Sequence, residues 1–324
     1  MNELIKEKAP GKVIITGEHA VIYGAPALSM QIMRYAYCSI QKGEGIKIVF
    51  KNTSTPELIS SFEEIVPIKI ALDKRYQAFL KGEITASQIL KDPRELLLYA
   101  ISLFASENNI KIRGILIQIS SEIPLRAGFG SSAAIIVSLL KALARFFDIT
   151  FLENTLFKMA QKVEHLQHGK SSGLDVATVL SQMPIYFEKG HYQTIDIKTN
   201  ALHLIHTGPS SSTTGECVSH VKPHFLNTPL VQKFKTVTNQ ITDTLKSGEI
   251  QPLISAIKDN HQLLKKLGLV PKTVGNFIQE IEERGGAAKI CGAGSIFEGG
   301  AGCVLIVSEA SFEDLINKYH YQLI

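Results

Sequence analysis

The sequence predicts an α+β protein built from two domains. The chain has 324 residues, and a globular domain usually contains about 100–200. Strand-like segments come first, helical segments follow, and a second run of strands and helices closes the chain, which is an order typical of α+β folds. We therefore expect an N-terminal domain over residues 1–199 and a C-terminal domain over residues 200–324.

The first part of the chain predicts a sheet. Residues 13–15 and 34–41 have the composition of strands. The second of these segments ends in KGEG, which predicts a glycine-containing hairpin turn into the strand IKIVF. The first fifty residues should thus form an antiparallel sheet. Residues 68–105 follow as a helical segment with breaks, and RGILIQIS supplies another strand.

Two helices are predicted after that strand. Residues 133–147 are apolar on almost every side, which indicates a helix buried between other elements. The segment FLENTLFKMAQKVEHLQHG then ends at Gly169, a residue typical of a helix C-terminus. Its apolar residues lie at helical spacing: Leu152, Leu156, Met159, Val163 and Leu166.

The expected C-terminal domain opens with the strand ALHLIHTG. Two helices, a glycine-rich turn, the strand GCVLIV and a last helix complete it.

Charge and cysteine content exclude several classes of protein. Lys plus Arg number 34 and Asp plus Glu number 30, and the basic residues are scattered rather than gathered in a stripe, so we expect no nucleic-acid partner. The cysteines Cys38, Cys217, Cys291 and Cys303 form no C-x-x-C pair. We expect them to be reduced thiols of a cytoplasmic protein. No segment has the pattern of a signal peptide or the length of a membrane span, so we expect no membrane partner either.

The stretch EIPLRAGFGSSAAIIVSLLKAL places Gly128, Gly130, Ser131 and Ser132 directly before the buried helix. The unpaired N–H groups and the dipole of a helix N-terminus bind anions, and glycine lets the backbone approach a phosphate closely. A serine hydroxyl at this place could also ligate Mg²⁺. Alternatively, Ser131 or Ser132 only caps the helix.

Five further polar residues are candidates for phosphoryl transfer. Lys12, Glu18 and His19 lie in APGKVIITGEHAVIYGAPAL, and Glu164 and Asp175 follow the buried helix. Phosphoryl transfer uses one carboxylate for Mg²⁺, another for the attacking hydroxyl, and a cation that offsets charge. Four of them also have a plainer interpretation: Lys12 as a solvated lysine, His19 as a solvated turn histidine, Glu164 on a solvated helix face, and Asp175 as a helix cap.

A third glycine-rich stretch, KICGAGSIFEGGAGCVLIV, completes a set of three ordered motifs with PGKVIITGEHAVIYG and PLRAGFGSSAA. By these motifs the chain resembles the GHMP small-molecule kinases over most of its length. The resemblance implies an N-terminal domain like ribosomal protein S5 domain 2, a C-terminal ferredoxin-like domain, and an active site in the cleft between them. It also implies transfer of the γ-phosphoryl group of ATP to a hydroxyl of a small molecule, with Mg²⁺.

The resemblance assigns a role to four of the polar residues. Asp175 matches the residue that faces the substrate hydroxyl, and Lys12 matches the cation beside it, so these two are the expected catalytic pair. Ser132 and Glu164 match the Mg²⁺ ligands.

Binding roles follow from the same resemblance. The residues that match the phosphate-binding loops for ATP are Gly128, Gly130, Ser131, Ser132, Gly292 and Gly294. The residues that match substrate contacts are Glu18, His19 and Thr213. Homodimers are common in the family, so a homodimer is a possible state of this chain.

Two substrates are compatible with the motifs. His19 after Glu18 favours mevalonate, phosphorylated on its 5-hydroxyl. Family members that act on mevalonate usually read H-G-N-P-S-G-x-D-N where this chain has HGKSSGLDV, with Lys170, Ser171 and Val176 at the changed positions. These changes keep 5-phosphomevalonate open as an alternative substrate. A related decarboxylase is less favoured, and a ligand sensor without catalysis is a further alternative.

Overall fold

The computed structural model describes residues 4–226 and 228–324 and confirms the α+β class. The chain divides into two compact units. Unit 1 contains the described residues up to Gly11, Met33–Ile123 and Gly130–Leu180, and unit 2 contains Lys12–Ile32, Pro124–Phe129 and Ser181–Ile324. The expected domain boundary at residue 199 stays a prediction, because these units are defined by packing and do not divide the chain at a single residue.

Two long strands, β1 (Ile5–Thr16) and β2 (Ala27–Lys42), pair with each other and run through both units. Unit 1 adds three strands, in the order β4-β3-β5-β2. These are β3 (Gly45–Phe50), β4 (Leu58–Ser60) and β5 (Gly114–Ser121). Alternate residues of β5 are buried, which is the pattern of a strand with one face on the core.

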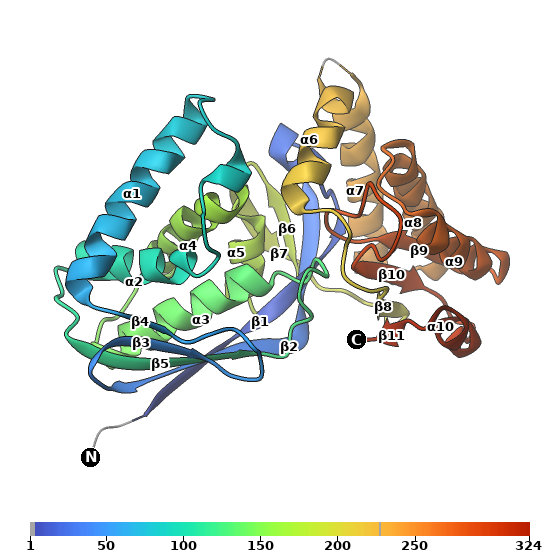
Figure 1. Cartoon of the computed structure of the whole chain (residues 1–324). Helices are drawn as coiled ribbons and strands as arrows, with labels where there is room; N and C mark the ends of the chain where they lie inside the picture. The colour runs from blue at the N-terminus through green and yellow to red at the C-terminus, as the bar shows by residue number, and fades with distance from the viewer. Residues whose placement is uncertain (1–3, 227) are drawn as a thin grey trace. The chain divides into compact units, whose positions relative to one another are not determined.

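Five α-helices of unit 1 lie on one side of these strands (Figure 1). They are α1 (Phe62–Leu80), α2 (Glu95–Glu107), α3 (Ser131–Phe146), α4 (Glu153–His168) and α5 (Leu174–Leu180), and a 3-10 turn, η2 (Ala86–Gln88), follows α1. Ser61 and Glu64 form a capping box that starts α1. Helix α3 is buried along most of its length, which confirms the helix expected over residues 133–147.

The hairpin predicted after residue 41 is wrong. Strand β5 lies between β2 and β3, antiparallel to β2 and parallel to β3. The short turn after β2 therefore passes around the start of β5, where Gly43 N–H donates a hydrogen bond to Gly114 O at 3.3 Å. The turn residues correctly indicated that the chain reverses after β2. The partner of β2 at this end is nevertheless β5, a strand much later in the sequence, and not β3.

Unit 2 holds two groups of strands. Residues 27–29 of β2 pair with β6 (Ile185–Glu188), which pairs with β7 (His191–Thr194). A separate antiparallel sheet has the order β11-β8-β10-β9. Its strands are β8 (Leu202–His206), β9 (Ala287–Ile290), β10 (Cys303–Val307) and β11 (Gln322–Leu323).

Helices separate β8 from β9 in the chain, and β9 and β10 are buried at every residue. The helices of unit 2 are η1 (Ala20–Tyr23, 3-10), α6 (Thr214–Phe225), α7 (Leu230–Ser247), α8 (Ile250–Lys266), α9 (Lys272–Glu283) and α10 (Glu313–Tyr319). The sequence predicted only two helices before the glycine-rich turn, whereas the described residues form four there, α6 to α9. Helix α8 packs on β9 and β10.

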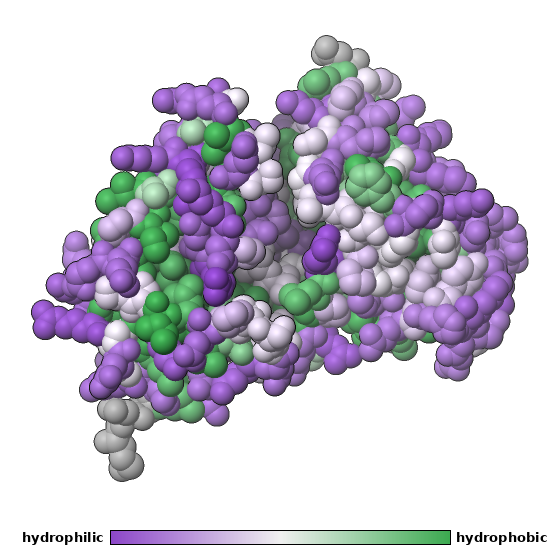
Figure 2. Space-filling view, viewed as in Figure 1, coloured by the Kyte–Doolittle hydropathy of each residue, from purple (hydrophilic) through white to green (hydrophobic). Residues whose placement is uncertain are grey.

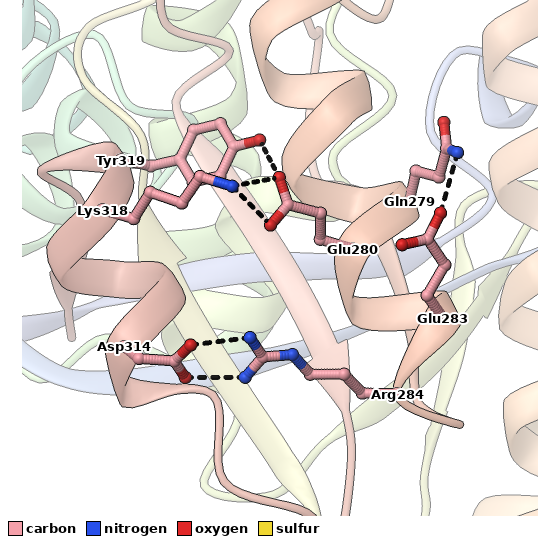
Figure 3. A network of polar contacts seen from close by, with 7 residues as sticks. All are labelled: Gln279, Glu280, Glu283, Arg284, Asp314, Lys318 and Tyr319. Carbon is pink, nitrogen blue, oxygen red and sulfur yellow. Dashed lines mark hydrogen bonds and ion pairs between the residues drawn. The ribbon is translucent and has the colours of Figure 1, made fainter.

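A surface network joins α10 to α9 (Figure 3). Arg284 donates two hydrogen bonds to the Asp314 carboxylate, both at 2.6 Å. Lys318 and Tyr319 both donate to Glu280. Exposed ion pairs of this kind contribute little individually to the free energy of unfolding. The bidentate contact of Arg284 with Asp314, however, fixes the orientation of the last helix.

Hydrophilic residues cover most of the face seen in Figure 2, with hydrophobic residues between them. Among the residues that the structure describes, no helix is long and apolar enough to cross a membrane.

We expect Gly114→Ala to destabilise the fold by about 1–3 kcal/mol, because a methyl group at this position would lie 2.2 Å from Gly43 O. The matched control is Gly215→Ala in the first turn of α6, where a methyl group meets nothing within 4 Å. That change should be neutral or slightly stabilising. Urea unfolding measures the change in free energy of unfolding for both variants. Equal changes would contradict the close approach of Gly43 to Gly114 at the start of β5.

Candidate functional site

The three motifs meet through their backbones inside unit 2. Lys12 N–H donates a hydrogen bond to Phe129 O at 2.9 Å, which ties the first motif to the second. A methyl group built on Gly128 would lie 3.2 Å from Cys291 O, and one on Gly292 would lie 3.5 Å from Gly128 Cα. The second and third motifs therefore touch at two glycines; a side chain at Gly128 would crowd the contact, and both residues have a positive φ that glycine favours. Lys12 is only 4% exposed, so the interpretation of a solvated lysine is wrong.

A buried ion pair anchors the first motif. Lys289 on β9 donates hydrogen bonds to the Glu18 carboxylate and to Ile15 O, the latter at 2.8 Å. Both side chains are almost inaccessible, at 0% exposure for Lys289 and 1% for Glu18. Glu18 Oε2 has no hydrogen-bond partner among the described residues. The sequence analysis missed Lys289, although a single lysine within the apolar strand AAKI signals that it needs a buried partner.

Burial and charge act in opposite directions on this pair. Burial raises the pKa of Glu18, and the charge of Lys289 offsets part of that rise. Burial by itself would lower the pKa of Lys289, but interactions with its neighbours Cys291 and Glu18 outweigh burial, so the pKa of Lys289 is raised. We conclude that Lys289 is a cation held by its buried neighbours.

His19 follows Glu18 and is fixed by the third motif. Its backbone has φ 60°, a conformation that is uncommon for a residue with a side chain. Its Nε2 lies 3.0 Å from Ala293 O, so Nε2 carries the proton and donates. Burial lowers the pKa of His19 to about 4, so the ring is neutral at pH 7. Its Nδ1 is buried without a partner among the described residues and can accept a hydrogen bond. The interpretation of a solvated turn histidine is therefore wrong.

The long third motif is held by the segment TGPSSST. Ser210 Oγ donates to Gly294 O at 2.8 Å, Ser211 Oγ donates to Glu298 O at 2.9 Å, and Ser212 Oγ accepts from Ile296 N–H at 3.0 Å. Ser211 and Ser212 thus satisfy polar groups of the residues SIFEGGA, which lengthen this motif, and Ser210 satisfies the glycine just before them. The sequence analysis gave them no role, although a run of hydroxyl residues indicates loop-to-loop hydrogen bonding.

Thr213 is the N-cap of α6. Its hydroxyl and backbone N–H both bond to the Glu216 carboxylate, at 2.8 and 2.7 Å. Glu216 N–H donates back to Thr213 Oγ1 at 3.2 Å. This capping box gives Thr213 a structural role, and its expected contact with substrate stays a prediction.

In unit 1, helix α3, which follows the glycines of the second motif, starts without a side-chain cap. Gly130 is its N-cap, in the left-handed conformation with φ 67°, and no cap hydrogen bond is formed by a side chain. The Ser131 hydroxyl is buried with no hydrogen-bond partner in the described part of the chain. The interpretation of these serines as simple helix caps is therefore wrong.

Ser132 and Glu164 are adjacent. Ser132 Oγ donates a hydrogen bond to Glu164 Oε1 at 2.7 Å, and Glu164 is 0% exposed. Its other oxygen, Oε2, lies 3.3 Å from His168 Nε2 but accepts no hydrogen bond within the described residues. Glu164 therefore does not lie on a solvated helix face.

This pair fits a magnesium ion. Mg²⁺ prefers oxygen ligands, usually takes only one or two from protein, and completes its shell with waters and phosphates. A serine hydroxyl and a buried carboxylate, one oxygen of which accepts no hydrogen bond from the described residues, are such a set. The described residues contain no group of three or more His, Cys, Asp or Glu side chains that could cage a metal.

Asp175 lies in the first turn of α5 and is half-buried. The helix begins at Leu174, so Asp175 is inside the helix and is not its cap. The side chain therefore projects from a short helix whose start is set by the loop HGKSSG.

The expected site residues divide between the units. Unit 1 contains Gly130, Ser131, Ser132, Glu164 and Asp175, and unit 2 contains Lys12, Glu18, His19, Gly128, Thr213, Gly292 and Gly294. Direct contacts join Ser132 to Glu164 in unit 1 and the three motifs in unit 2.

Comparison with known proteins agrees with this set of motifs. Residues 95–182 match the model of the GHMP kinases N terminal domain. The mevalonate kinase of Thermococcus sibiricus is 32% identical over 91% of this chain and 86% of its own length. The chain belongs to the GHMP kinase family.

Solved structures extend the likeness of this GHMP kinase to the whole fold. The Methanococcus jannaschii mevalonate kinase has a TM-score of 0.79 at 25% identity, with 100% of this chain and 97% of that chain covered. Streptococcus pneumoniae phosphomevalonate kinase, in complex with phosphomevalonate and AMPPNP, has a TM-score of 0.76 over 99% of this chain and 100% of that one. At 18% identity, the second likeness concerns the fold alone.

We expect Lys289→Met to destabilise this GHMP kinase by about 3–5 kcal/mol, because it leaves the Glu18 carboxylate buried without its cation. Adding Glu18→Gln should recover part of that loss, since the remaining amide carries no charge. Urea unfolding of the two single variants and the double variant measures the coupling. A double variant less stable than Lys289→Met would contradict the pairing.

Acid should weaken unit 2 through its buried histidines. Burial, with Lys265 and Lys289 nearby, lowers the pKa of His261 on α8 from 6.5 to about 4. The unfolded chain then binds the proton more tightly, so the stability is complete above about pH 6.5 and is lost as the pH falls toward 4. At 1.36 kcal/mol per pKa unit, the loss reaches about 3 kcal/mol.

The variant His261→Gln cannot take up this proton and should lose less stability than the wild type between pH 7 and 4.5. Urea unfolding at several pH values gives the dependence of the free energy of unfolding on pH for the variant and for the wild type. Part of the slope should remain in the variant because His19 titrates in the same direction. Identical slopes would contradict a neutral, buried His261.

Proposed function

We propose that this chain transfers the γ-phosphoryl group of ATP to the 5-hydroxyl of mevalonate. The observation that carries the proposal is the Ser132–Glu164 pair at the start of the glycine-capped helix α3, in a chain whose relatives are mevalonate kinases. Glycine-flanked helix starts bind phosphate, and an adjacent hydroxyl–carboxylate pair binds its magnesium ion.

The residues of the chain divide the work as follows. Ser132 and Glu164 would hold Mg²⁺, which when bound would offset charge on the phosphates of ATP. Backbone N–H groups at Gly128, Gly130 and Ser131 bind those phosphates. Gly292 and Gly294 keep the third motif narrow enough to approach them, with φ values of 81° and 70°.

At the acceptor, Asp175 takes the proton of the 5-hydroxyl. The hydroxyl oxygen forms a bond to the γ-phosphorus, the bond from that phosphorus to the β–γ bridging oxygen breaks, and ADP leaves with the electron pair. Lys12 offsets the negative charge that develops on the transferred group. Glu18, His19 and Thr213 orient the substrate, and the unpaired His19 Nδ1 supports this role because it accepts from a hydroxyl.

The runner-up substrate is 5-phosphomevalonate. Lys170 in the loop before Asp175 is exposed, as a solvated loop lysine is, and its charge would also suit a phosphorylated substrate. We favour mevalonate because Glu18 and His19 are both present and both fixed in place. A ligand sensor would need no metal pair and no catalytic aspartate. We place the reaction in the cytoplasm, where four unpaired cysteines stay reduced, and expect that the chain can act as a homodimer.

The decisive assay measures ADP release from ATP and Mg²⁺ with mevalonate and with 5-phosphomevalonate in parallel. We expect turnover with mevalonate. Asp175→Asn should lower kcat by about 10²–10³-fold with little change in the KM for ATP, because it removes a contact that matters in the transition state.

Three outcomes distinguish the alternatives. Turnover of 5-phosphomevalonate alone would assign the chain to the next phosphorylation. Binding of mevalonate without ADP release would favour a sensor. Full activity of Asp175→Asn would remove Asp175 from the mechanism while leaving the substrate assignment in place.

A further inference from the structure

The loop between α4 and α5 is anchored by a histidine that the family motifs do not include. Ser171 N–H donates a hydrogen bond to His165 Nδ1 at 3.0 Å. His165 lies on α4, directly after Glu164, and Tyr76 of α1 stacks on its ring with centroids 5.8 Å apart and planes 16° from parallel. The accepting nitrogen is therefore held by a helix on one side and by an aromatic ring on the other.

From Ser171, hydrogen bonds lead on to the start of α5. Ser171 Oγ accepts from Gly173 N–H at 3.2 Å, and Gly173 O accepts from Ala177 N–H at 2.9 Å in the first turn of the helix. Ser172 Oγ accepts from Leu174 N–H at 3.2 Å. The position of Ser171 therefore sets where α5 begins, and α5 carries Asp175 in its first turn.

This loop needs an anchor because its own backbone is permissive. Both Gly169 and Gly173 have positive φ, 73° and 89°, and glycine adopts many other conformations at little cost. The family pattern H-G-N-P-S-G-x-D-N places proline where this chain has Ser171. Proline restrains φ by its ring but has no N–H to donate. Serine gives up the ring and supplies the N–H that His165 accepts.

We propose that His165 is a positioning residue, which sets the Asp175 loop by accepting the Ser171 N–H and so replaces the restraint that proline gives in relatives. The inference rests on the proposed role of Asp175. Misplacing a reacting group by about 1 Å can cost about 10²-fold in rate. Loss of the anchor should therefore lower kcat, while the ATP phosphates, bound elsewhere, keep their affinity.

The test compares two substitutions at one position. His165→Leu removes the acceptor and keeps an apolar side chain under Tyr76. His165→Asn loses the ring but places an amide oxygen close to where Nδ1 lies, so it can still accept the Ser171 N–H. We expect kcat for mevalonate to fall 10-fold or more in His165→Leu, with the KM for ATP changed less than 3-fold, and to stay within about 3-fold of wild type in His165→Asn.

The variant Ser171→Pro provides a second test, because proline has no N–H to donate to His165. His165→Leu should then cost little additional kcat in the Ser171→Pro background, which is the signature of two residues that act through one contact. The same loss of kcat in both backgrounds would overturn the proposal. So would equal rates for His165→Leu and His165→Asn, since packing without the hydrogen bond would then explain the effect.

Hydrogen exchange of the loop peptide over residues 169–175 separates this inference from the proposed function. His165→Leu should exchange faster there than wild type and than His165→Asn, whatever substrate the enzyme accepts. Faster exchange in a protein that does not turn over mevalonate would support the anchor and overturn the substrate assignment. Unchanged exchange in a folded His165→Leu protein with normal mevalonate turnover would overturn the anchor alone.

Discussion

Lys289 and Glu18 form an ion pair in the interior of unit 2, where both side chains are almost completely buried. Lys289 stands in a strand that is buried at every residue, so its charge needs a partner close at hand. Glu18 supplies it, and Ile15 O accepts a further hydrogen bond from the same ammonium group. These contacts hold the first motif against β9. His19 then donates a hydrogen bond to Ala293 O, just after that strand.

The glycine-rich loops around this pair pose a second constraint, because buried backbone groups need partners. Lys12 N–H and Phe129 O satisfy each other, and Thr207 satisfies Gly302 O through its backbone N–H and its hydroxyl. Serines 210–212 extend the same arrangement along the lengthened third motif. The extra residues of that motif are thus held by hydrogen bonds. The glycines have no side chain, so the backbones of the loops can come close enough to form these bonds.

In unit 1, the end of helix α4 serves two purposes at once. Glu164 points its carboxylate to Ser132, and the next residue, His165, accepts a hydrogen bond from the loop that leads to Asp175. His168, one turn further on, lies beside the second oxygen of Glu164. A single helix end therefore links the proposed metal-binding pair, Ser132 and Glu164, to the loop that presents the proposed base, so a shift of this helix end would disturb both.

The sequence by itself determined the α+β class, the family and the buried helix after the phosphate loop, because these depend on local periodicity and on short ordered motifs. It also singled out Ser132 and Glu164, which the fold brings to 2.7 Å. Tertiary structure alone decided the insertion of β5 between β2 and β3, the pairing of Lys289 with Glu18 and the anchoring of Ser171 by His165. Each of these joins a residue to a partner outside its own element, and the choice among such partners is made by burial and hydrogen-bond satisfaction in the folded chain, which local patterns do not encode.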